Sequence, residues 1–68
     1  MISFKPLLKL LIDRDIKKTE LIQLCNISNA TVAKFSNDNE VALKVIDKVC
    51  KGLNCQPGDI MEYIPDKE

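Results

Sequence analysis

The stretch KKTELIQLCNISNATVAKFS, residues 17–36, constrains the fold most, because it contains two short helical patterns with almost nothing between them. In the first pattern Leu21, Leu24 and Cys25 recur at i, i+3 and i+4, so they share one face of a helix over about 18–25. In the second pattern Val32 and Phe35 mark the buried face of a helix over about 28–36. A link of three or four residues forces two helices to cross steeply.

The residues of this link suit such a crossing. Asn26 enters the left-handed backbone region more readily than most residues and can end the first helix. Ser28 is a good N-cap, because its hydroxyl can accept a hydrogen bond from a backbone N–H of the next turn. The pattern therefore predicts a helix-turn-helix, in which the second helix is free to lie in a DNA major groove.

At this point the chain resembles the Cro and phage-repressor family of helix-turn-helix proteins, also called XRE-type regulators. The apolar core positions of that family are occupied here by Leu21, Cys25, Ile27, Val32 and Phe35. The segment VALKVIDKVCKGLNCQPGDIMEY resembles the family's next helix and its short last helix. The resemblance covers nearly the whole chain. It implies an all-α, lambda-repressor-like bundle of four to five short helices in a small bacterial transcriptional regulator, such as a repressor.

The chain also departs from the family pattern at several positions. Ile22 stands where the family usually has alanine or glycine, and its bulk is expected to alter the close approach of the two motif helices. Asn26 replaces a common turn glycine. Lys17 and Ala42 stand where Ser or Thr commonly caps a helix, and each loss is expected to cost about 1 kcal/mol. Glu20 remains as half of a capping box.

Pro6 suits the first turn of a helix over about 6–14, because its missing N–H costs nothing there. The apolar stripe of this helix is expected to comprise Leu7, Leu8, Leu11 and Ile12. Ile16 is placed to staple the next helix to the core. The polar segment SNDNE, residues 36–40, is predicted to be a loop.

A fourth helix is predicted over about 42–53, with a clean apolar stripe formed by Val45, Ile46, Val49, Cys50 and Leu53. Gly52 and Asn54 lie at its end, where a left-handed residue is wanted, and Pro57 can open a last short turn through Met61. Both termini could form short strands, at Ile2–Phe4 and at Tyr63–Ile64. Such strands could pair within one chain or between two subunits, and the alternative is a frayed N-terminus with an apolar tail.

A chain of 68 residues allows one domain, residues 1–68, with a small core and little room for a catalytic cleft. Histidine is absent, the two glycines cannot form a phosphate-cradling loop, and the acidic residues are scattered, so an enzyme is not expected. No run of eighteen apolar residues and no signal peptide is indicated, so we expect a cytoplasmic protein without a membrane partner. No cofactor and no small-molecule ligand is indicated.

The three cysteines are Cys25, Cys50 and Cys55, with no CxxC pair among them. An odd number of cysteines without histidine indicates neither a disulfide framework nor a four-ligand zinc site. Core filling is the expected role of Cys25 and Cys50, while Cys55 is expected nearer the surface. A redox sensor is the alternative, and it would require a lowered thiol pKa for which the sequence offers no argument.

The net charge is zero, but the charges are unevenly distributed along the chain. Residues 1–36 carry six basic and three acidic side chains, whereas residues 37–68 carry four basic and seven acidic ones. The half with the helix-turn-helix is therefore expected to face a polyanion, and the acidic half to face away from it.

The predicted base contacts lie at the start of the second motif helix and one turn further along its exposed face: Ser28, Asn29, Ala30, Ala33 and Lys34. The resemblance implies the same positions. The predicted phosphate contacts flank them at the start of the first motif helix and around the following loop: Lys17, Lys18, Thr19, Thr31, Ser36, Asn37 and Asn39. For Thr31, a hydrogen bond to its own backbone is the competing interpretation.

The expected partner is double-stranded DNA, and the expected assembly is a homodimer on a palindromic site, since one small module reads only a few base pairs. The terminal segments, or helix 42–53 through Tyr63, are the predicted dimer interface. The alternative function is a protein-binding adaptor or antitoxin-like module on the same fold, to which the modest charge is suited.

Overall fold

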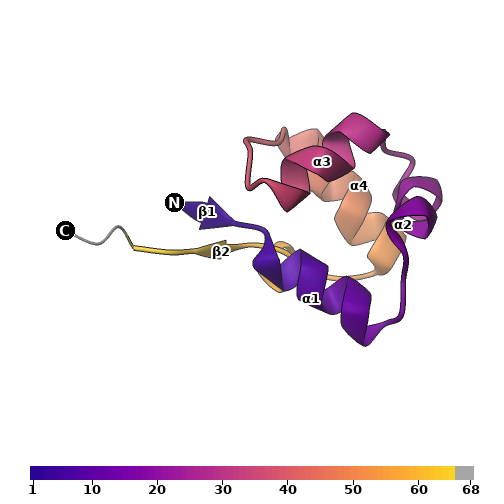
Figure 1. The fold of residues 1–68 in the computed structure, drawn as a ribbon, viewed down its shortest axis with the longest axis horizontal. Coiled ribbons are helices and arrows are strands. Elements are labelled where there is room, and N and C mark those ends of the chain that lie inside the picture. Colours follow the sequence, from indigo (N-terminus) through magenta and orange to yellow (C-terminus); the bar gives the residue numbers. More distant parts are fainter. Residues whose placement is uncertain (66–68) are drawn as a thin grey trace.

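The computed structural model describes residues 1–65 and contains four α-helices, one 3-10 turn and one small sheet (Figure 1). In chain order the elements are β1 (Ile2–Ser3), α1 (Lys5–Asp13), α2 (Lys18–Cys25), α3 (Asn29–Ser36), α4 (Leu43–Leu53), η1 (Pro57–Asp59) and β2 (Glu62–Tyr63). The predicted all-α bundle is confirmed. The predicted helix ends differ from those of the structure by one residue at most. Helix α1 begins and ends one residue earlier than predicted, and Ser28 and Ala42 are N-caps just outside their helices. The last turn is shorter than expected.

The two terminal segments pair within one chain as an antiparallel sheet. Ile2 lies opposite Tyr63 and Ser3 opposite Glu62, and the Ile64 N–H donates to the Met1 carbonyl at 2.8 Å. Figure 1 shows this sheet projecting from the helices as an arm. Pairing of the termini within the chain is thus the arrangement found, and not a frayed N-terminus.

The core is a single apolar cluster to which every helix contributes: Phe4, Leu7, Leu11, Leu21, Cys25, Val32, Phe35, Ile46, Val49, Leu53 and Ile60. The predicted burial of two residues of the apolar stripes is wrong. Leu24 is 53% exposed and Ile12 is 78% exposed, because each lies at the edge of its stripe, where no neighbouring helix covers it. Leu8, Val45 and Cys50 are half-buried.

All four helices end in the same way, at a left-handed residue that is not glycine: Asp15, Asn26, Asp38 and Asn54, with φ of 55°, 53°, 54° and 53°. The following N–H then reaches back to a carbonyl of the last helical turn, in the bonds Ile16 to Leu11 (2.8 Å), Ile27 to Ile22 (3.2 Å), Asn39 to Lys34 (2.8 Å) and Cys55 to Cys50 (3.0 Å). This is the Schellman motif, which satisfies carbonyls that a helix end would leave unpaired. Asn and Asp tolerate the left-handed region better than other side chains, which explains their choice at these positions.

The end of α4 decides between the two residues that the sequence offers for the left-handed position. Asn54, and not Gly52, is the left-handed residue, and Gly52 lies inside the helix. A Cβ atom at Gly52 would lie 2.6 Å from Cys25 Sγ and 2.8 Å from the Leu24 carbonyl oxygen. Gly52 therefore lets α4 approach the end of α2 closely. Ile22, which was expected to disturb the approach of α2 and α3, is half-buried and packs against the core.

Candidate nucleic-acid interface

Helix α3 presents one polar edge to solvent because its opposite face is firmly buried. Phe35 is 1% exposed, and its ring meets that of Phe4 edge to face, with centroids 4.8 Å apart and planes at 86°. Val32 is buried one turn earlier. Edge-to-face aromatic pairs are favourable beyond the apolar area they bury, so this contact fixes how α3 is oriented on α1.

The start of α3 is capped as predicted. The Ser28 Oγ accepts from the Thr31 N–H at 3.2 Å and lies 3.0 Å from the Thr31 hydroxyl. The Ser28 hydroxyl is thus engaged in the cap, although the residue remains exposed. Thr31 is half-buried, and its hydroxyl has a hydrogen-bond partner in Ser28. The partner of the Thr31 hydroxyl is the Ser28 side chain, and not the backbone of Thr31 that the competing interpretation expected.

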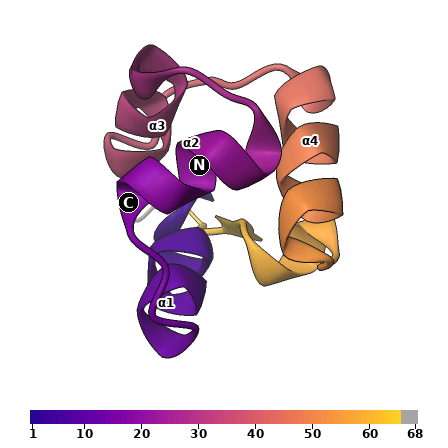
Figure 2. The ribbon, with the colours of Figure 1, turned by 90° about the vertical axis from the view of Figure 1, so that its right-hand side faces the viewer.

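All of the predicted base-contact residues are solvent-exposed on or next to α3: Ser28, Asn29, Ala30, Ala33 and Lys34. The predicted phosphate-contact residues are also exposed, apart from the half-buried Thr31: Lys17, Lys18, Thr19, Ser36, Asn37 and Asn39. The edge from Asn29 to Lys34 is therefore accessible to a partner. In Figure 2, α2 lies in front, with α3 and α4 on either side of it.

The two flanks of the predicted phosphate site meet at one hydrogen bond. The Lys18 Nζ donates to the Ser36 Oγ at 3.0 Å and so connects the first turn of α2 to the last residue of α3. The Lys17 N–H donates to Glu20 Oε1 at 3.2 Å, which is the half capping box that the sequence predicts. The Glu20 carboxylate is thereby held at the start of its own helix, and Lys18 is exposed.

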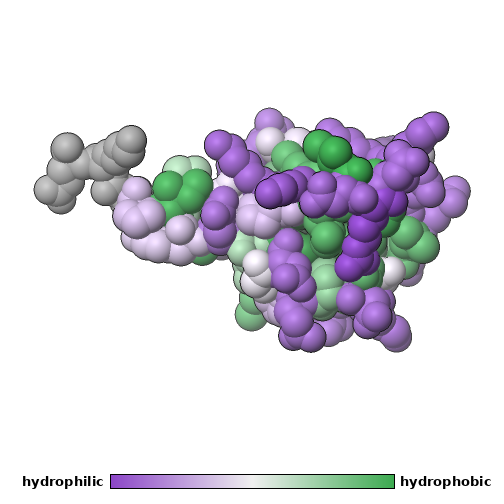
Figure 3. All heavy atoms as spheres, turned by 90° about the horizontal axis from the view of Figure 1, so that it is seen from below, coloured by the Kyte–Doolittle hydropathy of each residue, from purple (hydrophilic) through white to green (hydrophobic). Residues whose placement is uncertain are grey.

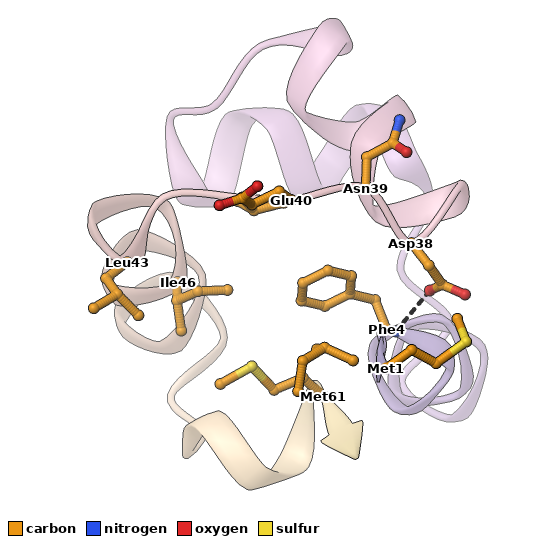
Figure 4. Close-up of a pocket in the computed structure, with 10 residues that line it drawn as sticks. Met1, Phe4, Asp38, Asn39, Glu40, Leu43, Ile46 and Met61 are labelled. Atoms are coloured by element: carbon orange, nitrogen blue, oxygen red, sulfur yellow. Dashed lines mark hydrogen bonds between the residues drawn. The ribbon is translucent and has the colours of Figure 1, made fainter. Parts of the chain in front are cut away.

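The loop after α3 is anchored by a residue that sequence reasoning missed. The Asp38 Oδ1 accepts from the Phe4 N–H at 2.8 Å, across 34 positions of the chain, as the dashed line in Figure 4 shows. Phe4 is the N-cap residue of α1 and offers no side-chain cap of its own, so Asp38 satisfies a donor at that helix start. The polar composition of the loop was visible in the sequence, but nothing in it indicated which carboxylate would reach another helix.

A second missed contact holds the other end of α1. The Arg14 guanidinium donates to the Leu53 carbonyl at the end of α4. Arg14 counts toward the basic half of the chain, yet this bond directs its head group to the last turn of α4 and away from α3. The charge of Arg14 could be read from the sequence, but the direction of its side chain could not.

The helix-turn-helix described above also occurs in known proteins to which this chain is similar. A family model described as the Cro/C1-type HTH DNA-binding domain matches residues 6–66. The chain belongs to this family. It is 34% identical over 61 residues to the HTH-type transcriptional regulator YozG of Bacillus subtilis (strain 168), covering 87% of this chain and 73% of that protein. The crystal structure of the transcriptional regulator VanUg is 45% identical and superposes with a TM-score of 0.87, covering 96% of this chain and 87% of that one.

Membership of the Cro/C1-type family establishes a DNA-binding regulator and not an enzyme, as the sequence predicts. Within residues 1–65, no helix is long and apolar enough to cross a membrane. The same residues hold no cluster of three or more side chains able to ligate a metal.

The cysteines are reduced and differ in burial. Cys25 is buried, as expected of core filling, and burial raises the pKa of its thiol, with a smaller contribution from Cys50. Cys55 is half-buried, and burial together with the Cys50 thiol raises its pKa as well. Neither shift produces the lowered thiol pKa that a redox sensor was expected to require.

Proposed function

We propose that the protein is a sequence-specific regulator that places α3 in the major groove of duplex DNA. The observation that carries the proposal is the exposed edge from Asn29 to Lys34 on a helix whose opposite face is fixed by Val32 and Phe35. Asn29 can bond the N6 and N7 of an adenine together, Lys34 can donate to a guanine, and the Ala30 methyl can contact a thymine methyl. Ser28 and Ala33 complete the proposed base contacts.

The proposed phosphate contacts flank that edge. Lys17, Lys18 and Thr19 lie at the start of α2, where unpaired N–H groups and the helix dipole favour an anion. Thr31, Ser36, Asn37 and Asn39 supply further hydrogen-bond donors from α3 and the loop that follows it. The hydrogen bond between Lys18 and Ser36 keeps both flanks together, so one phosphate can contact the two groups at once.

The test is binding to duplexes selected from random DNA, measured by fluorescence anisotropy over a range of salt concentrations. Affinity should fall with salt with a log-log slope of about −0.9 for each phosphate neutralised. Lys18→Ala should weaken all sequences alike and reduce the slope by about one. Asn29→Ala should cost ~1–3 kcal/mol on the selected site and relax the preference at one base pair.

Two matched variants serve as controls. Lys44→Ala removes a lysine that is also exposed, from the first turn of α4, and should leave binding unchanged. Ser36→Ala removes the partner of Lys18 and retains the charge, so it should change affinity less than Lys18→Ala. If no duplex shows salt-sensitive binding, the protein-binding adaptor or antitoxin-like alternative is favoured. If Lys44→Ala weakens binding as much as Lys18→Ala, the assigned surface is wrong.

We further propose a homodimer, which doubles the number of base pairs read. The apolar surface suited to it lies around a hollow of ≈ 430 Å³ between the arm, the loop after α3 and the start of α4. In Figure 4 the Phe4 ring and Met61 point into this hollow, while Asn39 points away from it. Leu43, on its rim, is 80% exposed. A projecting leucine beside an apolar hollow can fit the same surface of a second copy about a two-fold axis.

The exposed apolar side chains of the arm, Ile2 and Tyr63, extend this surface. In Figure 3 apolar patches lie among polar groups on the body, and a separate apolar patch lies on the arm. Leu43→Lys should shift the protein toward monomer in sedimentation, and Leu24→Lys, on an exposed leucine of α2, should not. A monomer at high concentration and on DNA would overturn the dimer while leaving DNA binding by the monomer intact. We place such a bacterial regulator in the cytoplasm, where its DNA target lies.

A further inference from the structure

The end of α4 brings two thiols together. The Cys55 N–H donates to the Cys50 carbonyl at 3.0 Å across the left-handed Asn54, which closes the Schellman motif described above. In that motif the first residue after the turn commonly contacts the residue whose carbonyl it bonds. The contact exists here, since the Cys50 thiol is a hydrogen-bond partner of the Cys55 thiol, and together with the larger effect of burial it raises the pKa of Cys55.

The corresponding pairs at two other helix ends are ordinary apolar residues. At the end of α1 the pair is Leu11, in the last helical turn, with Ile16 after it, and at the end of α2 the pair is Ile22 with Ile27. A pair of cysteines meets the same requirement for apolar contact, because a free thiol behaves as a small hydrophobic group. The two thiols add a covalent chemistry that the leucine and isoleucine pairs lack.

This pair is more exposed to reagents than the third cysteine. Cys50 and Cys55 are half-buried and line an open hollow of ≈ 570 Å³ together with Asp47, Lys51 and Gln56. Cys25 is 3% exposed, and its Sγ faces the Val49 carbonyl beneath α4. An oxidant entering from solvent therefore meets Cys50 and Cys55 first.

The backbone is also in place for a bond between the two sulfurs. A disulfide needs Cα atoms about 4.4–6.8 Å apart, with side chains that face one another. A backbone hydrogen bond between the two residues, with thiols in contact, is compatible with both conditions. We propose that Cys50 and Cys55 are a reversible dithiol pair that closes to an intramolecular disulfide across the end of α4.

A low-molecular-weight disulfide such as oxidised glutathione can act as the oxidant. One cysteine thiolate attacks a sulfur of the oxidant, which releases one reduced thiol and leaves a mixed disulfide on the protein. The second cysteine then attacks the protein-bound sulfur, so that the Cys50–Cys55 bond forms and a second reduced thiol leaves. Two electrons pass to the oxidant, and the two cysteine protons end on the two released thiols.

The surroundings of the pair predict how the reaction depends on pH. Burial raises the pKa of Cys55 most, the Cys50 thiol and the Asp59 carboxylate of η1 raise it further, and Arg14 after α1 opposes them. Asp47 and Lys51 also line the hollow. Because thiolate is the reacting form, closure should be slow near neutrality and accelerate about tenfold per pH unit below the thiol pKa.

The experiment treats the reduced protein with oxidised glutathione, blocks the remaining thiols with an alkylating agent and maps the peptides by mass spectrometry. The expected product is a single chain, without a disulfide to a second copy, in which residues 50 and 55 are linked and Cys25 is alkylated only after unfolding. Because the map is made on the unaltered chain, it does not depend on any variant folding. Cys50→Ala and Cys55→Ala should each abolish the bridge, whereas Cys25→Ala should retain it.

Three results would overturn the proposal. They are a bridge that includes Cys25, a disulfide between two chains in place of the internal one, and glutathione adducts on Cys50 or Cys55 that never resolve to the bridge. Resistance of both thiols to the oxidant at pH 9 would overturn it as well. The DNA-binding test does not involve these residues, so the two proposals can fail separately.

Discussion

The ends of α2 and α4 have nearly the same backbone and lie against each other. Asn26 follows α2 with φ 53° and ψ 52°, and Asn54 follows α4 with φ 53° and ψ 56°. Each is followed by a residue whose N–H returns to the last helical turn. The two ends meet where Gly52 passes Cys25, the last residue of α2.

What comes after the turn differs between the two ends. After α2 the chain continues through Ile27 to Ser28, whose hydroxyl caps α3 at once. After α4 it continues through Cys55 to Gln56 and Pro57, which open only the short turn η1 before the arm. One backbone motif thus sets the exit direction of both helices, and the residues that follow decide whether a recognition helix or a connecting segment is built.

The largest effect should come from the point where the two ends touch. Gly52→Ala places a methyl group against the Leu24 carbonyl, a backbone atom that cannot turn away, and against Cys25 Sγ. We expect a loss of about 3 kcal/mol in the free energy of unfolding, as at overpacked core sites. Urea denaturation followed by circular dichroism measures it.

Gly58→Ala is the matched control, because a Cβ atom there meets nothing within 4 Å. Its stability should stay within about 0.5 kcal/mol of the unaltered chain, as for other surface substitutions. Alanine is intrinsically the better helix former by about 1 kcal/mol, so a stabilised Gly52→Ala variant would mean that the two helix ends do not touch as described.

This contact also shows how far the sequence alone could lead. Periodicity predicted the four helices, the turn and the capping role of Ser28, because these depend on residues close together in the chain. It left open whether Gly52 or Asn54 takes the left-handed position, and it placed Leu24 inside, because both depend on how α4 lies against α2. The bond from Phe4 to Asp38 spans 34 positions and was invisible for the same reason. At the candidate site, exposure of α3 followed from its pattern, whereas the link between Lys18 and Ser36 did not.

A second prediction separates the side-chain pairs at the two ends. Ile27→Ala removes a branched side chain that packs against the core beside Ile22, and should cost about 2 kcal/mol. Cys55→Ala removes a single sulfur from the equivalent position and should cost about 1 kcal/mol or less. Urea denaturation measures both losses of unfolding free energy. Equal losses would show that the cysteine pair stabilises its helix end as much as the isoleucine pair does, which would contradict the prediction.

The third prediction concerns what the two ends share. Asn26→Gly and Asn54→Gly relieve the cost of a side chain in the left-handed region, a cost that asparagine already reduces. Each should gain about 0.5 kcal/mol, after the greater unfolded-state freedom of glycine is set against the relief. Thermal unfolding of both variants measures the gain in stability, with Gly58→Ala as a control. Gains that differ between the two helix ends by more than 1 kcal/mol would contradict the equivalence of the two ends.

The smallest effect is the pH dependence of the two thiols that lie on the two ends, Cys25 and Cys55. Burial raises the pKa of each in the folded chain, so the unfolded chain loses these protons first as pH rises through about 8.5. Between the unfolded and folded pKa values the folded state holds more protons, and the free energy of unfolding therefore falls as pH rises. Below pH 8 these thiols should not change the free energy of unfolding.

Urea denaturation at pH 7 and pH 9.5 measures this effect. The difference in the free energy of unfolding between the unaltered chain and Cys25→Ala should narrow at the higher pH, and the difference between the unaltered chain and Cys55→Ala should narrow as well. Because the other titrating groups are common to all three proteins, a difference that stays constant would show that the folded thiols titrate as in the unfolded chain.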